Sequence, residues 1–191
     1  MSHTKVRGGL RSKAALAVCG LTAATVIPLA ASGSAQAAPY CGITWGSTAK
    51  VSAALTSDTV RGARSGQHTC YDRLVLDLGG YGHSTGYRVR YVSAVSGPSG
   101  MPVPLSGAAR LQIDVNAAAS DSRGNPTYRP ADPRHVTDVT GYRTFRQVAL
   151  IASFEGKSTF GLGVRARLPM RAFVIQDPTG QRLVIDVAHR W

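Results

Sequence analysis

This sequence contains few of the side chains that catalyse hydrolysis or bind metal ions. Its 191 residues include one glutamate, Glu155, with nine aspartates, five histidines and three cysteines. The histidines are scattered, and no His-x-His, HExxH or Gly-x-Ser-x-Gly pattern occurs. Many zinc and serine hydrolases carry their reactive groups at such fixed spacings. The absence of these motifs therefore argues against the zinc and serine hydrolases that are recognised by them. We therefore expect no catalytic residue, no metal site and no cofactor.

Helical periodicity is also missing. Beyond residue 37, no segment places apolar residues at i, i+3, i+4 and i+7 over three turns. Short runs instead alternate apolar and polar residues, with clusters rich in glycine and proline between them. The pattern predicts strands over 72–79, 87–95, 108–116, 142–153, 159–168, 171–176 and 182–188. Short strands at nearly regular spacing indicate an all-β fold, either an antiparallel β-sandwich or a flattened barrel.

Two of the predicted strands are near copies of each other. The stretch DRLVLDL at 72–78 returns as QRLVIDV at 181–187, with the same alternation of apolar and polar positions. If the copies are antiparallel neighbours, with residue 73 opposite 186, 75 opposite 184 and 77 opposite 182, two Arg–Asp pairs flank a valine pair. This register is a hypothesis, because parallel or distant strands fit the alternation equally well.

The aspartates of the two copies, Asp77 and Asp186, allow two interpretations. A glycosidase needs two carboxyl groups a fixed short distance apart. Each aspartate, however, follows an arginine by four residues and therefore shares a strand face with it. We expect ion pairs at these positions.

The first 37 residues have the organisation of a secretory signal peptide. A basic start precedes an alanine-rich apolar run over 14–31, and Ala35-Gln36-Ala37 then supplies a small-x-small cleavage pattern. The apolar run is short for a spanning helix and contains glycine and threonine. We expect cleavage after Ala37, which gives a secreted protein without a transmembrane segment in the mature chain.

The remaining 154 residues are enough for one domain with a core. We expect an N-terminal arm over 38–60 and a β domain over 61–191. Within that domain, the glycine-containing stretch 61–69 is interpreted as a turn-rich connection that leads into the first strand.

Cys41 and Cys70 are the only cysteines after residue 37. An even pair in an exported chain predicts a disulfide. The bond would close a loop of about 30 residues and stabilise the fold by roughly 3–4 kcal/mol. A metal site is the alternative, but His68 is the only further candidate ligand at close spacing.

Lysine is nearly absent from residues 38–191, where 16 of the 18 basic side chains are arginine and face 10 acidic ones. Arginine suits bidentate contacts with carboxylates and phosphates. A basic exported protein meets anionic polymers outside the cell. The composition therefore favours a cell-wall glycopolymer or peptidoglycan as partner over nucleic acid.

Two runs place arginines on one strand face. In VRARLPMR at 164–171, the apolar positions alternate with Arg165, Arg167 and Arg171, and Val89 and Tyr91 alternate similarly with Arg88 and Arg90. No acidic residue interleaves in either run. A solvated face and an anion-binding strip both fit this pattern. We take the five arginines as candidate binding residues.

A long loop is predicted over 119–135, which contains three prolines and little that is apolar beyond Tyr128. Surface loops of this length often carry binding function, but a mobile insertion fits the composition equally well. Under the first interpretation Tyr128 joins the candidate binding residues.

The stretch Gly161-Leu162-Gly163-Val164-Arg165-Ala166 imitates the GxGxxA motif of dinucleotide-binding folds. No helical pattern follows it, as that fold requires. We expect the glycines to allow close packing of backbone in a β-hairpin, whose tip would hold Glu155 and Gly156.

The order of several motifs resembles the AMIN-like domain of secreted actinobacterial proteins. These motifs are HTCYDRLVLDL at 68–78, GYRVRYV at 86–92, GYRTFRQV at 141–148, SFEG at 153–156, GLGVRARLP at 161–169 and RLVIDVAHRW at 182–191. The resemblance implies an envelope-associated β-sandwich module without catalytic residues. Such a module is similar to the AMIN domains that hold peptidoglycan amidases and secretins near the cell wall.

Three functions remain open at this point. The first is a non-catalytic envelope module that binds wall polymer through the arginine face. The second is a small secreted hydrolase of an anionic polymer, with His68, Glu155 or His189 as acid or base. The third is a secreted protein that binds another protein through exposed aromatic side chains.

Overall fold

The computed structural model describes residues 38–54, 58–80 and 84–191. The predicted signal peptide, residues 1–37, lies outside these ranges. The described residues form one short 3₁₀ helix and twelve strands: η1 Tyr40–Gly42, β1 Lys50–Ser52, β2 Asp58–Gln67, β3 Tyr71–Leu78, β4 Tyr87–Val92, β5 Val95–Ser96, β6 Pro102–Val103, β7 Ala109–Val115, β8 Ala117–Ala118, β9 Phe145–Phe154, β10 Lys157–Val164, β11 Met170–Asp177 and β12 Gly180–Ala188. Within these ranges, no helix has the length and apolar character needed to cross a membrane.

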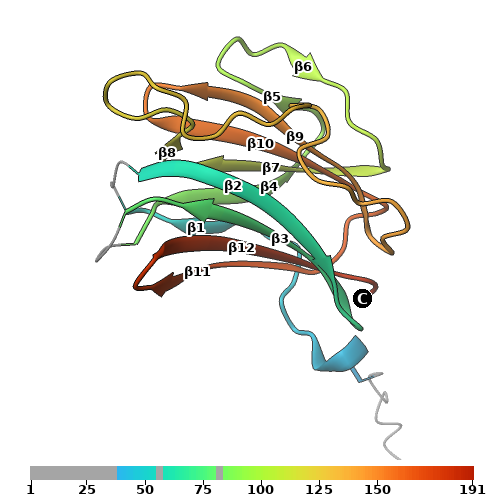
Figure 1. The fold of residues 1–191 in the computed structure, drawn as a ribbon. Helices are drawn as coiled ribbons and strands as arrows, with labels where there is room; N and C mark the ends of the chain where they lie inside the picture. Colours follow the sequence, from blue (N-terminus) through green and yellow to red (C-terminus); the bar gives the residue numbers. More distant parts are fainter. Residues whose placement is uncertain (1–37, 55–57, 81–83) are drawn as a thin grey trace, which may run out of the picture. The chain divides into compact units, whose positions relative to one another are not determined.

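Two five-stranded sheets form the fold (Figure 1). The first sheet has the order β1-β4-β7-β10-β9 and the second the order β11-β12-β3-β2-β8, while β5 and β6 form a small separate sheet. Neighbouring strands are antiparallel except β2 and β8, which share a short parallel pairing. The predicted all-β sandwich is confirmed.

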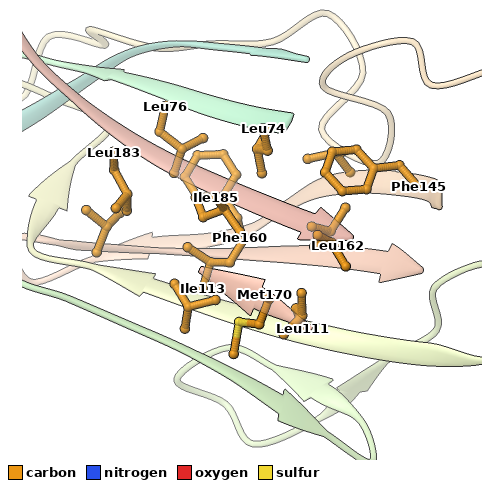
Figure 2. Close-up of a cluster of buried hydrophobic side chains, with 14 of the residues drawn as sticks. Leu74, Leu76, Leu111, Ile113, Phe145, Phe160, Leu162, Met170, Leu183 and Ile185 are labelled. Atoms are coloured by element: carbon orange, nitrogen blue, oxygen red, sulfur yellow. The ribbon is translucent and has the colours of Figure 1, made fainter. Parts of the chain in front are cut away.

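The core lies between the inner faces of the two sheets. Because side chains alternate across a strand, every second residue of each central strand points inward. Figure 2 shows the two sets meeting, and both are fully buried: Leu74, Leu76, Leu183 and Ile185 from the second sheet, and Leu111, Ile113, Phe160 and Leu162 from the first. Each such side chain contributes about 1.5–3 kcal/mol through burial.

The predicted register of the repeat strands is confirmed. Strands β3 and β12 are antiparallel neighbours, with residues 73, 75 and 77 opposite 186, 184 and 182. The Arg73 guanidinium donates two hydrogen bonds to Asp186, from Nε at 2.7 Å and Nη2 at 2.9 Å. This hydrogen bonding raises the pKa of Arg73 above its usual value.

The second predicted ion pair, between Asp77 and Arg182, is wrong. Asp77 instead accepts two hydrogen bonds of 3.0 Å from Arg64 on β2, and Arg182 binds Asp177. Strand β2 pairs with the other edge of β3 and places Arg64 opposite Val75, one diagonal step from Asp77. A diagonal neighbour is within reach of a long side chain. Asp77 therefore pairs with Arg64 and not with Arg182, although the predicted register of β3 and β12 is correct.

Strand β2 corrects the expectation of a turn-rich connection at 61–69. Its ten residues pair with β3 along almost their entire length. Of the two glycines that suggested turns, Gly62 has a packing role, because a Cβ there would lie 3.3 Å from Oδ2 of Asp77, whereas a Cβ at Gly66 would meet open space. Residues 50–52 of the predicted arm also form a strand, β1, which pairs with β4.

Strand β10 ends at Val164, four residues before the predicted end. The chain then crosses from the first sheet to the second, where β11 begins at Met170. Residues 165–169, here called the crossing segment, continue the alternation of inward and outward side chains. Leu168 is 4% exposed, and Met170 directly after the segment is fully buried. The pattern therefore identified the inward positions correctly but not the end of the strand.

The predicted close packing of backbone at the glycines of β10 is confirmed at Gly163 and wrong at Gly161, where side chains approach instead. A Cβ at Gly163 would overlap the carbonyl oxygen of Ser106. At Gly161 it would lie 2.6 Å from Cδ1 of Leu105, which is the end of a flexible side chain. The hairpin tip is confirmed too, since Glu155 and Gly156 join β9 to β10 with φ angles of 49° and 77°.

Alanine substitutions of these two glycines are expected to differ in effect. Gly163→Ala should lower the free energy of unfolding by about 2–3 kcal/mol, because a main-chain carbonyl has to move. Gly161→Ala should lower it by about 1 kcal/mol, because the Leu105 side chain can change rotamer. Urea denaturation of both variants measures the difference. Equal losses would contradict the close main-chain contact at Gly163.

Candidate functional site

Arg165, Arg167 and Arg171, here called the arginine patch, lie in the crossing segment and at the start of β11. Arg165 donates through Nη2 to the carbonyl oxygen of His189. Arg167 donates to Ser47, to Oγ at 3.1 Å and to the carbonyl oxygen at 3.2 Å. Both arginines are exposed, and neither forms an ion pair among the described residues. Each is therefore positioned by neutral groups and keeps its charge unpaired.

Aromatic rings from other segments lie beneath the patch. The Arg167 guanidinium is 5.1 Å from the ring centroid of Tyr91, and that of Arg171 is 4.3 Å from Trp45. Burial raises the pKa of the Tyr91 hydroxyl, against the opposing effects of a Leu168 hydrogen bond and of the Arg167 charge. Such cation–π contacts restrict the long arginine side chains. The N-terminal arm, through Trp45 and Ser47, thus supports the patch.

Arg171 differs from its two neighbours because it neutralises a buried acid. The Asp186 side chain is fully buried. Its Oδ1 accepts a hydrogen bond from Arg73 Nε at 2.7 Å, and its Oδ2 accepts one from Arg171 Nε at 2.8 Å. The sequence shows no acid within the 164–171 run, but β12 places Asp186 directly opposite Arg171. The absence of acids within the run therefore did not exclude an acidic partner on the neighbouring strand.

Arg88 and Arg90 belong to a different surface. They project from the outer side of β4 in the first sheet, because Val89 between them is buried in the core. Arg171 projects from the outer side of the second sheet, so the structure does not bring the two predicted rows together. Arg90 pairs with Asp114 of β7 at 2.6 Å, whereas Arg88 is exposed.

Tyr128 lies within the connection between β8 and β9, which contains the predicted loop 119–135. Its ring packs against Phe160, with 6.3 Å between centroids, and burial raises the pKa of its hydroxyl. The neighbouring Thr127 hydroxyl donates to the carbonyl oxygen of Val60 at 2.8 Å. Tyr128 therefore packs with the core and attaches the loop to the sandwich.

Two of the candidate acid–base residues, His68 and His189, line one cleft of about 430 Å³. Glu155 lines a different cleft, beside the β9–β10 hairpin. His189 is almost buried, and its Nε2 lies 3.0 Å from Oδ1 of Asp72. Among the described residues, none with a carboxylate lines the cleft of His68 and His189, here called the histidine cleft, so the paired carboxyl groups of a glycosidase are not assembled by them there.

Sequence reasoning missed the contact between His189 and Asp72. The two residues are 117 positions apart and belong to no common motif. Asp72 precedes the alternating part of the first repeat, and His189 follows that of the second. The antiparallel register of β3 and β12 brings these two ends together. The predicted register could have indicated the pair, because it brings Asp72 at the start of the first repeat close to His189 after the second.

The sequence model of one protein family matches residues 58–189, and its description is AMIN-like domain. This chain belongs to the AMIN-like domain family. The resemblance seen in the motifs is therefore confirmed. No curated protein and no solved structure matches the chain. The AMIN-like domain extends from the first residue of β2 to His189 and contains both repeat strands.

A disulfide joins the AMIN-like domain to the segment before it. Cys41 and Cys70 are bonded, with 6.3 Å between their Cα atoms, as predicted. Cys70 is therefore not a thiolate, which removes it from the alternative metal site with His68. Residue 41 lies outside the matched range and residue 70 inside it. The bond thus fixes to the AMIN-like domain the arm that carries Trp45 and Ser47.

Proposed function

We propose that this protein is an exported, non-catalytic module of the cell envelope that binds an anionic cell-wall polymer through the arginine patch. Membership of the AMIN-like domain family supports this role. The disulfide fits an oxidising compartment outside the cytoplasm. The excess of arginine over acidic residues after position 37 suits carboxylate or phosphate groups of such a polymer.

The observation that carries the proposal is how the patch is held. Among the described residues, each guanidinium of the patch uses only one or two of its five N–H groups for hydrogen bonds within the protein. The remaining donors are left for a ligand. Stacking on Tyr91 and Trp45 has already reduced the side-chain freedom of Arg167 and Arg171. Ordering on binding therefore costs less than for a free arginine.

The three arginines are expected to contribute unequally. Arg165 and Arg167 carry unpaired charges, whereas the charge of Arg171 is shared with Asp186. Exposed charge contacts are individually small, about 0.2–1 kcal/mol, and weaken with salt. Binding of a polymer would therefore depend on several contacts made together, mainly through Arg165 and Arg167.

Co-sedimentation of the full chain with purified cell wall tests the proposal. Replacing Arg165 and Arg167 together by glutamine should lower the apparent affinity about tenfold, because two contacts of about 0.7 kcal/mol are removed. Added salt should weaken binding of the unmodified protein more than that of the variant. The melting temperature should fall only slightly, because both arginines are exposed and neither pairs with an acid, although their hydrogen bonds to His189 and Ser47 are lost.

A matched control replaces Arg123 and Arg129, two exposed arginines of the 119–135 loop, by glutamine. It removes the same charge and should leave wall binding within about twofold of the original. Unchanged binding in the Arg165 and Arg167 variant would identify the patch as a solvated face. A larger loss in the control would place the contact on the loop.

A further inference from the structure

The histidine cleft is formed by three segments that meet at the ends of strands. Gln67, His68 and Thr69 come from the end of β2 and the turn after it, Arg143 precedes β9, and His189 follows β12. Arg143 is exposed and has no ion-pair or hydrogen-bond partner for its guanidinium among the described residues. The cleft therefore contains one unpaired positive charge, two imidazole rings and no carboxylate in its lining.

Asp72 fixes the orientation of His189. One carboxylate oxygen of Asp72 accepts the main-chain N–H groups of Thr144 at 2.6 Å and Phe145 at 3.0 Å. The other oxygen lies 3.0 Å from Nε2 of His189. Because a carboxylate held by two N–H donors acts as an acceptor, Nε2 carries a proton and donates it to Asp72. Asp72 thereby fixes the proton of the neutral imidazole on Nε2. Carboxylates behind functional histidines orient the ring in the same way.

The other ring nitrogen of His189 has no partner. His189 is only 6% exposed, and its Nδ1 atom is buried. This atom forms no hydrogen bond with any described residue. A buried polar atom without a partner destabilises the fold, because the hydrogen bond that it makes with water in the unfolded chain is not replaced. His189 lines the cleft, so a group that enters the cleft and reaches Nδ1 would supply the missing partner.

The charge state of His189 decides what that group can be. When the ring is neutral, Nδ1 is an acceptor, and when the ring is protonated, Nδ1 becomes a donor. Within the part of the chain that the structure describes, the charged or titratable groups that contact His189 or line its cleft are Asp72, Arg165, His68 and Arg143. In the protonated state, the cleft presents donors from His189, His68 and Arg143.

We infer that this cleft is a second anion site, distinct from the arginine patch, and that it binds a tetrahedral oxyanion of the phosphate class when His189 is protonated. Donors from three separate segments suit an anion with more than two acceptor oxygens, which a carboxylate lacks. The site holds one such group and so differs from the extended contact proposed for the patch.

Isothermal titration of the full chain with sulfate tests the site. Sulfate is a tetrahedral anion whose own charge stays constant over the range in which histidine side chains titrate. Binding should be at least about tenfold tighter at about pH 5.5 than at about pH 8. Equal affinity at the two pH values, or no binding at the lower one, would overturn the inference.

Three variants assign the effect to the cleft. Arg143→Gln should weaken sulfate binding about tenfold at the lower pH, and the control Arg129→Gln should not change it. His189→Gln keeps a donor toward Asp72 but cannot gain a proton, so it should reduce the pH dependence to the part that His68 contributes, and an unchanged pH dependence would overturn the inference. If that variant does not fold, the ring nitrogen chemical shifts of His189 in the unmodified protein decide. Sulfate should move the Nδ1 resonance, whereas a purely structural histidine would be unaffected.

Competition at about pH 5.5 identifies the source of the phosphate group, since inorganic phosphate and dimethyl phosphate are both monoanions there. Displacement of sulfate by both compounds indicates a phosphodiester of a polymer. Displacement by inorganic phosphate alone indicates a free phosphate or a monoester. Displacement by neither would refute the assignment to the phosphate class. None of these measurements depends on wall binding by Arg165 and Arg167, so the two proposals can fail separately.

Discussion

Replacing Asp186 by asparagine is expected to lower the free energy of unfolding by about 2–4 kcal/mol. The substitution keeps the volume of the side chain but removes a buried negative charge that two arginines share. Arg73 and Arg171 would then face each other across β12 without a counter-charge. Both guanidinium groups remain partly hydrated, with 24% and 38% of their side chains exposed. That hydration places the expected loss somewhat below the full penalty for a broken buried ion pair.

Asp77→Asn is the matched control. Asp77 sits on the same outer face, but it is 35% exposed and its partner Arg64 is 54% exposed. An exposed pair of this kind contributes about 0–1 kcal/mol, so the control should lose no more than that. Urea denaturation of both variants at low and high salt gives the comparison. Similar losses for Asp186→Asn and Asp77→Asn would show that burial does not strengthen the Asp186 pairs.

Loss of the disulfide is expected to have an effect of similar size. With Cys41 and Cys70 both replaced by serine, the free energy of unfolding should fall by about 3–4 kcal/mol. The two cysteines are 29 residues apart, and the bond restricts that loop in the unfolded chain. It also holds the segment that contributes Trp45 and Ser47 to the arginine patch.

Denaturation of the oxidised protein, the reduced protein and the double serine variant measures this effect. The reduced protein and the variant should agree with each other and lie below the oxidised form. Wall binding should also weaken in the variant, because Arg167 and Arg171 lose their support. A stability loss under about 1 kcal/mol would mean that the bond restrains little of the unfolded chain.

Much of the fold was predictable from the sequence because its signals are local. Alternation of apolar and polar residues identified the strands and their inward positions, and it holds even through the crossing segment up to Met170. The repeat gave the register of β3 and β12, since only one antiparallel alignment opposes each arginine to an aspartate. Glu155-Gly156 marked a hairpin tip because few residue pairs adopt two positive φ angles.

Other features were decided by contacts between distant segments. Strand β2 has few apolar residues and two glycines, so its pairing with β3 has no local signal. Asp77 pairs with Arg64 because β2 lies along the other edge of β3. Arg171 pairs with Asp186 because β12 places that residue opposite it. Alternation indicates which face a side chain occupies, but not which charge the neighbouring strand places beside it.

The candidate sites divide in the same way. Composition and alternation determined that arginines would share outer faces, and the family motifs determined the type of domain. Only the tertiary structure separated Arg88 and Arg90 from the arginine patch, placed Tyr128 against Phe160, and joined His189 to Asp72. The physical reason is that a strand's periodicity is set by its own backbone, whereas the partner of a polar side chain is set by the packing of sheets and loops.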